Sequence, residues 1–429
     1  MSATILEPGS AAYEAARRPA MARFAEVRPE AIVRCASAAD VAWALALARG
    51  RRVAVRSGGH CFAGRSSTDG VLIDVGPMEA VEPEGELVRI GAGARLGQVY
   101  DALDAVGRTI AGGCGPEVGI AGLTLGGGLG VLGRLHGLTC DQLVAAQVVL
   151  ADGRVVRCDA RTEPGLFWAL RGAGGGQFGV VCELTLRTVP APRATVFHLR
   201  HPLAGAAALI GAWQRFAPVA PDALAASLLC NGRGVHVFGA LAGPREEAEA
   251  LLAGLGEPET ATVEELPWRA AKRWLAEHGP GDGPPGGLDF AASEFFREPL
   301  PADTLAALAG HLERGLGEGH HCELDFSPWG GAYGRVAPGA TAFVHRDARF
   351  LLKQGVVVAP GRDPEPARAW LRRSYALTHP HGTGGTYPNF PDLDLDDPLR
   401  AYHGGNLARL RELKAEYDPN GVFAFPQSL

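Results

Sequence analysis

Apolar residues occur with two different spacings in the first third of the chain. From Ser37 to Gly50 they recur at helical spacing, with Ser37 and Asp40 placed as in an N-terminal capping box and Gly50 placed as a C-terminal stop. Short apolar runs at residues 53–57 and 71–75 predict strands on either side of a glycine-rich turn. A second helix is expected over residues 96–106, ending before a glycine.

The pattern changes in the middle of the chain. Helical stretches at residues 207–216 and 245–255 are separated by strand-like runs, and Asn231-Gly232 between two such runs predicts a hairpin turn. A charged helix is expected at residues 407–417. This order predicts an α+β domain, in which helices cover one face of an antiparallel sheet.

Length and charge narrow the class of protein. A chain of 429 residues can form two or three domains, and its hydrophobic (47%) and charged (21%) fractions are those of a globular protein. The net charge of −6 and only three lysines argue against a nucleic-acid partner. Because no signal-peptide or membrane-spanning pattern is found, we expect a cytoplasmic protein without a membrane partner, acting as a monomer or homodimer.

Glycine takes more than a third of residues 112–137, which is too much for an ordinary helix or sheet core, so the backbone must approach something closely. Residues 128–133 and 174–179 each match G-x-G-x-x-G, but neither opens the strand-turn-helix unit that a Rossmann site requires. A P-loop is excluded because no lysine follows a glycine. Loops at residues 56–60 and 112–130 could instead hold a dinucleotide, since unobstructed N–H groups form anion sites.

Several motifs in the same order carry a family resemblance. They are RSGGHCFAGRS (residues 56–66), VGIAGLTLGGGLG (118–130), LFWALRGAGGGQFG (166–179), YHGGN (402–406), YDPN (417–420) and FPQS (425–428). Together they resemble the berberine bridge enzyme-like branch of the vanillyl-alcohol oxidase superfamily. The resemblance implies an α+β fold with a two-subdomain, PCMH-type FAD-binding domain at residues 1–190. It further implies an inserted substrate domain of antiparallel sheet covered by helices at 191–382, and a C-terminal segment at 383–429 that returns to the first domain.

The resemblance also implies that FAD is the cofactor and that His60 is bonded to the 8α-methyl carbon of its ring. A loop histidine that only hydrogen-bonds a phosphate is the alternative from the residues alone. The pyrophosphate loop would be Arg56, Ser57, Gly58 and Gly59. The other implied cofactor contacts are Ser66, Cys114, Val118, Gly119, Gly122, Gly127, Gly128, Gly130, Val180 and Asn406.

Two of these positions bear on the type of flavoprotein. Many relatives attach the flavin a second time through a cysteine three residues before Val118, where this chain has Gly115. Cys114 lies one residue earlier, so it is either a second attachment point or a buried thiol. Valine at position 118 goes with oxidases in this family and leucine with dehydrogenases, although Val118 could simply fill core space.

The catalytic base is ambiguous, because both bases usual in the family are replaced. Arg335 stands where plant relatives have a glutamate, and Phe390 stands where oligosaccharide- and polyketide-oxidising relatives have a tyrosine. The remaining candidates are Glu323, Asp325, Tyr333, Tyr387 and Tyr402. Glu323 and Asp325 should share one face of a strand, but each candidate could equally be structural. His345 and Arg346 are expected to support a domain interface.

These expectations describe an oxidase that transfers a hydride from a small-molecule substrate to flavin N5, with O₂ reoxidising the flavin to give H₂O₂. The substrate could be an alcohol, an amine or a natural-product intermediate, and the missing tyrosine makes a sugar less expected. Oxidative cyclisation or desaturation, a dehydrogenase with another acceptor, and a non-enzymatic flavin carrier stay open as alternatives. No metal site is expected.

Overall fold

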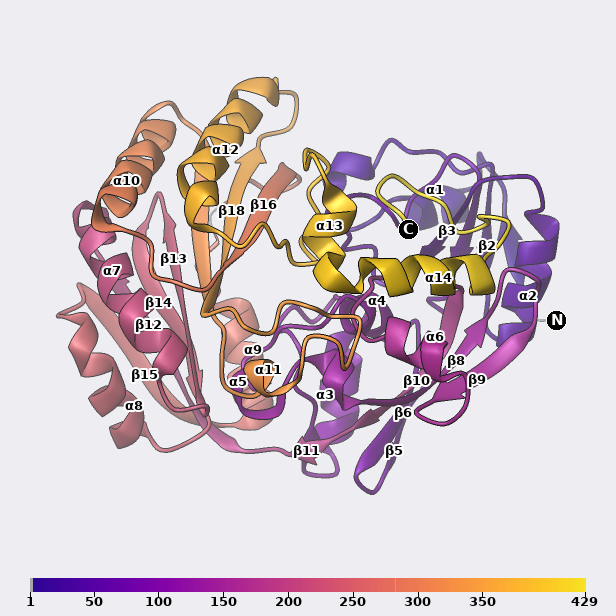
Figure 1. The fold of residues 1–429 in the computed structure, drawn as a ribbon, viewed down its shortest axis with the longest axis horizontal. Coiled ribbons are helices and arrows are strands. Elements are labelled where there is room, and N and C mark those ends of the chain that lie inside the picture. Colours follow the sequence, from indigo (N-terminus) through magenta and orange to yellow (C-terminus); the bar gives the residue numbers. More distant parts are fainter. Residues whose placement is uncertain (1–2, 282) are drawn as a thin grey trace.

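The structure, a computed structural model, describes residues 3–281 and 283–429. Figure 1 shows the N-terminal part of the chain on the right and a large sheet, covered by helices, on the left. The C-terminal segment, in yellow, runs from the large sheet back across the N-terminal part. None of the helices in the described ranges combines the length and apolar character that a membrane span needs.

The first sheet contains β1 (Thr4–Leu6), β2 (Ala31–Arg34), β4 (Val71–Asp74) and β3 (Val53–Arg56), in that order. β2, β4 and β3 are parallel, whereas β1 is antiparallel to β2. α1 (Ala11–Arg17) precedes β2, and α2 (Ala38–Leu47) connects β2 to β3, with the Ser37 hydroxyl accepting a hydrogen bond from the Asp40 N–H at 3.2 Å. The predicted helix and both strands are confirmed. Because β3 ends at Arg56, the loop that carries His60 emerges at the carboxyl edge of parallel strands, where ligands commonly bind.

The second sheet is antiparallel throughout. Its order is β5 (Val81–Glu84), β6 (Leu87–Gly91), β10 (Val180–Arg187), β8 (Leu143–Val149) and β9 (Val155–Asp159). Four helices accompany it: α3 (Leu96–Asp104), α4 (Ile120–Leu125), α5 (Gly133–His136) and α6 (Pro164–Ala169). The predicted helix at α3 is confirmed but ends two residues earlier. A short ribbon of β7 (Arg108–Thr109) and β11 (Val189–Pro190) follows the second sheet toward the next part of the chain.

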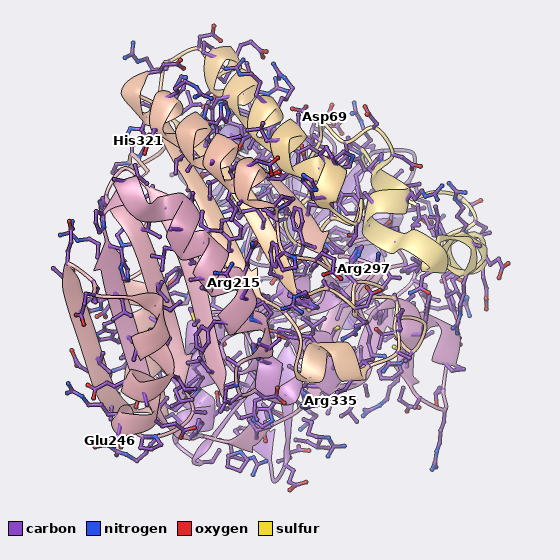
Figure 2. The ribbon with its side chains drawn as sticks, turned by 60° about the vertical axis from the view of Figure 1, so that its left-hand side comes forward. Asp69, Arg215, Glu246, Arg297, His321 and Arg335 are labelled. Atoms are coloured by element: carbon purple, nitrogen blue, oxygen red, sulfur yellow. The ribbon has the colours of Figure 1, made fainter. Side chains whose placement is uncertain are left out.

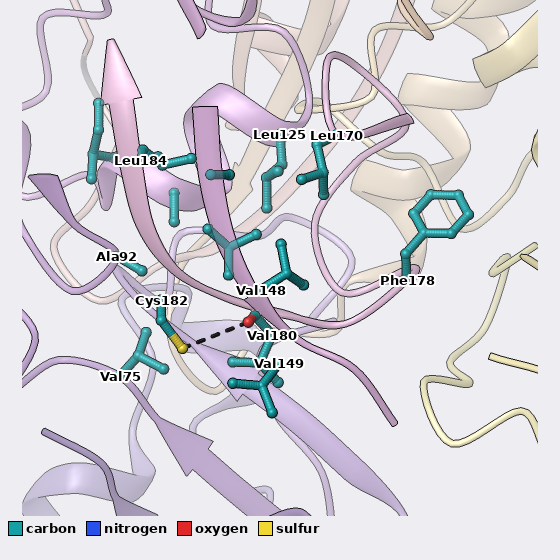
Figure 3. Packing of buried hydrophobic residues seen from close by; sticks show 14 of the residues in the cluster. Val75, Ala92, Leu125, Val148, Val149, Leu170, Phe178, Val180, Cys182 and Leu184 are labelled. Carbon is teal, nitrogen blue, oxygen red and sulfur yellow. Dashed lines mark hydrogen bonds between the residues drawn. The ribbon is translucent and has the colours of Figure 1, made fainter. Parts of the chain in front are cut away.

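One hydrophobic core joins these two sheets. It includes Val33 and Ile73 from the first sheet and Val148, Val180 and Leu184 from the second, all buried. Figure 3 shows the part of this core around β8 and β10. Each fully buried valine or leucine contributes roughly 1.5–3 kcal/mol, so the two sheets form a stable support for the loops at their edges.

The third sheet has seven strands, and every neighbouring pair is antiparallel. Its order is β15 (Thr260–Pro267), β12 (Arg193–His201), β14 (Gly234–Leu241), β13 (Leu224–Asn231), β17 (His321–Pro328), β18 (Phe350–Val358) and β16 (Leu288–Phe296). One face packs against α7 (Ala206–Phe216), α8 (Arg245–Leu252), α10 (Ala302–Gly317) and α12 (Glu365–Thr378). The α+β class is therefore confirmed.

Two details of this sheet differ from the sequence-based expectation. Helices were expected on one face only, but α9 (Trp268–Glu277) packs on the opposite face, against Val196 and Ala240. The hairpin turn consists of Gly232 and Arg233, one residue later than predicted, because Asn231 pairs with Gly234. The Asn231 side chain is buried and donates to the Pro280 carbonyl at 2.7 Å, which keeps it within the strand. The domain boundaries at residues 190 and 382 stay a prediction.

The C-terminal segment connects the two parts of the chain. The backbone of Phe295 in β16 exchanges hydrogen bonds with Thr383 and Gly385, at 2.9 and 3.0 Å. The chain then forms α13 (Pro398–His403) and α14 (Leu407–Tyr417), and α14, which matches the predicted helix, packs against α6. The Lys414 ammonium donates to the Gln177 carbonyl at 2.6 Å, which fixes this helix against the segment that leads into β10.

Candidate active site

The two glycine loops meet backbone to backbone at the edge of the first two sheets. A Cβ atom added at Gly58 would lie 2.3 Å from the Gly119 nitrogen, and one added at Gly119 would lie 2.4 Å from the Gly58 nitrogen. The Ser57 hydroxyl donates to the Ala92 carbonyl at 2.6 Å and so ties the first loop to the second sheet. Only glycine fits at both contact positions, which explains the motif without any ligand.

Arg95, the residue before α3, links the same two loops. Its Nη1 donates to the carbonyls of Gly58 and Glu117, at 2.9 and 2.7 Å. His60 is half-buried, and Glu117 lies close enough to affect the pKa of its imidazole. Burial, and then the nearby Arg95 cation, lower the pKa of His60. No sequence pattern points to Arg95, because its partners lie 37 and 22 residues away along the chain.

Arg56 braces the loop from within. Its buried guanidinium donates to the Ser66 carbonyl at 3.0 Å, the Arg17 carbonyl at 3.0 Å and the Ser67 hydroxyl at 3.1 Å. It also donates to the Ala16 carbonyl. With these donors already used, the side chain shapes the loop at residues 56–59, and the role of this loop in holding a pyrophosphate stays a prediction.

The glycines of the second loop divide into two groups. A Cβ atom added at Gly127 would meet Tyr387 at 3.2 Å, one at Gly128 would meet Thr139 at 2.3 Å, and one at Gly130 would meet a neighbouring backbone carbonyl at 2.2 Å. These three positions are therefore needed for packing within the protein. At Gly122, by contrast, an added Cβ would meet no atom of the described chain within 4 Å, so this position leaves room for a ligand.

Two buried polar atoms without partners lie just after His60 along the chain. Arg65 Nε and Ser66 Oγ are both buried, and neither has a hydrogen-bond partner among the described residues. A Cβ added at Gly174, in the other glycine-rich motif, would lie 3.8 Å from Arg65 Nη1. A cation, an unused hydroxyl and side-chain-free loops together fit the anionic pyrophosphate of a dinucleotide such as FAD.

Cys114 contacts the other half of the molecule. Its sulfur lies 3.6 Å from Nζ of Lys272 in α9. Lys272 is buried and also donates to the carbonyls of Gly112 and Gly113, at 3.1 and 2.6 Å. A Cβ added at Gly115 would meet only Val118 Cγ2 among the described atoms, at 3.1 Å. The thiol is thus part of a contact between the loop and α9.

The other predicted cofactor contacts lie in supporting positions. Val118 is partly buried against the shared core, and its carbonyl accepts a hydrogen bond from the Leu96 N–H at 3.0 Å. Val180 is fully buried at the start of β10. The Asn406 side-chain nitrogen donates to the Pro338 and Thr341 carbonyls, at 2.9 and 3.1 Å, and so holds the loop before β18.

A cluster of charged side chains lies on the face of the large sheet opposite α12. Glu323 and Asp325 alternate along β17 and so share this face, as predicted, and Asp325 is paired in register with Lys353 of β18. The Lys353 ammonium lies 2.5 Å from a Glu323 carboxylate oxygen. It also lies 5.9 Å from the ring centre of Phe62 and 5.7 Å from that of Phe390. Because Phe62 is two residues after His60, the cluster faces the loop that carries His60.

Asp325 has the pKa of a candidate base. Burial raises its pKa to about 6, although Lys353 acts in the opposite direction and Glu323 in the same one. Burial also raises the pKa of Asp289 on β16. The pKa of Lys353 is raised despite its burial, because Glu323 and Asp325 favour its charged form. An aspartate that ionises near neutrality can accept a proton efficiently.

The three candidate tyrosines connect segments of the chain. The Tyr387 hydroxyl accepts hydrogen bonds from the Gly128 and Leu129 N–H groups, at 3.0 and 2.9 Å. The Tyr402 hydroxyl donates to Gln427 at 2.9 Å, and the Tyr333 hydroxyl to the Gly130 carbonyl at 3.1 Å. Burial raises the pKa of Tyr387 and of Tyr402 to about 12, and raises that of Tyr333 as well. Their contacts favour structural roles over that of a base.

Three further residues singled out from the sequence lie away from the cluster. Arg335 is the last residue of the short helix α11 (Ala332–Arg335; Figure 2), and its exposed side chain pairs with Asp222. Arg346 binds both carboxylate oxygens of Asp141, at 2.8 and 2.7 Å, and His345 Nε2 lies 3.0 Å from the Tyr402 carbonyl. The contacts of His345 and Arg346 are those expected of interface residues.

A groove of about 690 Å³ lies elsewhere, beside α12 and the C-terminal segment. Arg297, Arg372 and Arg400 line it together with several aspartates. It does not include Lys353 or the glycine loops, so the charged cluster and not this groove faces the cofactor loops.

Comparison with known proteins agrees with this geometry. Residues 29–159 match the family model of an FAD binding domain, and residues 386–429 match that of the berberine and berberine-like proteins. The fold and the site therefore define an FAD-dependent oxidoreductase with a PCMH-type FAD-binding architecture. More particularly, the chain belongs to the berberine bridge enzyme-like family of FAD-linked oxidoreductases, as its motifs suggested.

Individual relatives cover nearly the whole chain. The FAD-linked oxidoreductase YgaK of Bacillus subtilis is 34% identical over 426 residues, which span 94% of this chain and 91% of YgaK. Chitooligosaccharide oxidase of Gibberella zeae is 33% identical, over 89% of this chain and 82% of its own. The solved structure of Physcomitrella patens BBE-like 1 superposes with a TM-score of 0.91 at 28% identity, and covers 100% of this chain and 96% of its own.

Proposed function

We propose that this protein is an oxidase that removes a hydride from an alcohol, an amine or a natural-product intermediate and passes the electrons to O₂, giving H₂O₂. The observation that carries this proposal is Asp325, a carboxylate with a raised pKa that lies beside Lys353 and faces the loop of His60. FAD, when bound, supplies the hydride acceptor at N5. The chain must then orient the substrate and take up one proton.

Asp325 is the proposed base for the substrate O–H or N–H. Lys353, paired with Glu323, limits the rise of the Asp325 pKa and so keeps a useful fraction ionised near neutrality. The rings of Phe62 and Phe390, 5.8 Å apart and edge to face, supply an apolar wall that excludes water. Asp325 and the two rings can together hold the substrate carbon that carries the O–H or N–H group against the cofactor.

His60 is the proposed single point of covalent attachment for FAD, with Arg65, Ser66 and the glycine loops holding the rest of the cofactor. The contact between Cys114 and Lys272 supports a structural role for the thiol. We therefore expect the flavin absorbance spectrum of Cys114→Ala to match that of the parent protein, because no sulfur atom is bonded to the ring in either. A shifted spectrum would instead support a second bond through sulfur, since a thioether on the ring is part of the chromophore.

Val118 is the proposed gate for oxygen. In Val118→Leu, one added methylene should slow peroxide formation by roughly 10-fold or more, a typical effect of one methylene in a tight space, while reduction of an artificial dye stays unchanged. Stopped-flow reoxidation of the reduced flavin measures the first quantity directly. Equal reoxidation rates in both proteins would assign Val118 to packing.

The substrate class is tested by a panel of oligosaccharides, amino alcohols and polyketide alcohols. The curated relatives include a chitooligosaccharide oxidase and an aclacinomycin oxidase, so both carbohydrates and polyketides belong in the panel. We expect one compound to bleach the flavin anaerobically and to yield one H₂O₂ per product in air. Bleaching without peroxide would indicate a dehydrogenase, and a cyclised or desaturated product would indicate the alternative natural-product reaction.

A further inference from the structure

Arg95 connects the backbone that carries His60 to the backbone of residue 117. Arg95 Nη1 donates to the Glu117 carbonyl at 2.7 Å, and Glu117 lies close enough to His60 to affect the pKa of its imidazole. Arg95 also holds the Gly58 carbonyl, two residues before His60, at 2.9 Å. One guanidinium therefore fixes the His60 loop and residue 117 relative to each other.

This arrangement restrains the position of the imidazole. Gly58 is two residues before His60, so a fixed Gly58 carbonyl limits the movement of the loop that carries the imidazole. A reacting group that is held in one position meets its partner in the correct geometry more often.

The surroundings of His60 also favour the reactive form. Burial, and then the Arg95 cation, lower the pKa of the imidazole, and Glu117 acts in the opposite direction. Because only a neutral imidazole carries a lone pair, this balance leaves His60 nucleophilic at neutral pH.

We propose that Arg95 is a positioning residue for covalent flavin attachment: by holding the Gly58 and Glu117 carbonyls it fixes the loop that carries His60, so that a ring nitrogen of His60 is placed to attack the 8α-methyl carbon. The inference rests on the attachment through His60 proposed above. In that reaction a C–N bond replaces one methyl C–H bond. The methyl hydrogen and the imidazole hydrogen leave as protons with two electrons, and O₂ takes up both, giving H₂O₂.

The test compares total and acid-stable flavin in purified Arg95→Met, Arg95→Lys and the parent protein. We expect Arg95→Met to keep total flavin within about twofold but to lose acid-stable flavin by roughly 10-fold or more, since misplacing a reacting group by about 1 Å costs up to ~10²-fold. Arg95→Lys retains the cation but not the guanidinium, and its acid-stable flavin should lie between those of Arg95→Met and the parent protein. Arg108→Met is the matched control, because Arg108 binds the Thr188 carbonyl at 2.9 Å away from the site and should behave as the parent.

A second measurement separates positioning from simple loosening of the loop. Arg95→Met protein that still holds FAD is incubated over a range of pH, and the slow growth of acid-stable flavin is followed. Removal of the cation should move the pH midpoint of this growth upward relative to Arg95→Lys.

Three outcomes would overturn the inference, and they can be told apart. Equal acid-stable fractions in Arg95→Met and the parent would remove Arg95 from the attachment reaction. If total flavin fell as much as acid-stable flavin in Arg95→Met, Arg95 would be needed for cofactor binding and not for attachment. A parent protein that itself lacks acid-stable flavin would refute the His60 bond, and the role of Arg95 with it.

Discussion

Asp325→Asn is expected to lower kcat/KM by about 10²- to 10⁴-fold, the usual contribution of a general base, while flavin content stays unchanged. In the parent, kcat/KM should rise with pH up to about 6, where Asp325 ionises, and then level off. The Asn variant should lack this ionisation. Steady-state rates at saturating oxygen, measured from pH 5 to 9, check both results.

The same substitution should not weaken the fold. Because the folded chain raises the Asp325 pKa from 3.8 to about 6, the protein binds this proton more tightly than the unfolded chain does. The tighter binding of this proton increases the free energy of unfolding at low pH, and this contribution is lost as the pH rises through about 6. Replacement by a neutral amide at pH 7 should therefore leave Tm equal or higher.

Glu294→Gln is the matched control for Asp325→Asn. Glu294 is a buried carboxyl in β16 of the same sheet, and burial raises its pKa too. It lies on the face toward α12 and accepts a hydrogen bond from the Gly384 N–H at 2.8 Å, which a glutamine oxygen can still accept. A loss of kcat/KM in Glu294→Gln as large as in Asp325→Asn would mean that the effect is not specific to the cluster around Lys353.

His60→Ala is expected to abolish acid-stable flavin and to make flavin content depend on added FAD. Without the covalent tether, the effective concentration of FAD at its site falls to that of free FAD in solution. At saturating FAD, kcat should still fall roughly 10- to 100-fold, because an untethered ring is held less accurately. Absorbance after acid precipitation and kinetics with excess FAD measure the two effects. His136→Ala is the control, a half-buried histidine in α5 whose pKa is also lowered by burial. If His60→Ala kept its acid-stable flavin, another residue would carry the bond.

Local sequence patterns predicted the elements that depend on neighbouring residues. The helix capped by Ser37, the strands on either side of the His60 loop and the C-terminal helix each follow from spacing within a few residues. Period-two alternation also placed Glu323 and Asp325 on one face correctly. The family followed from motifs spread over the whole chain, and the relatives confirm it.

Contacts between distant segments could not be predicted in this way. Lys353 joins the cluster because β18 pairs with β17 in one register, and Arg95 joins the loops because α3 starts beside both. The glycines at 127, 128 and 130 look the same in sequence whether a ligand or a protein side chain approaches them. The side of the sheet covered by α9 likewise depends on packing between halves of the chain.

Peptide mass spectrometry of the purified protein tests the central claim most directly. After proteolysis, the peptide that contains His60 should carry the mass of FAD, and the peptide that contains Cys114 should be unmodified. Colourless protein, or a His60 peptide of ordinary mass, would contradict the account.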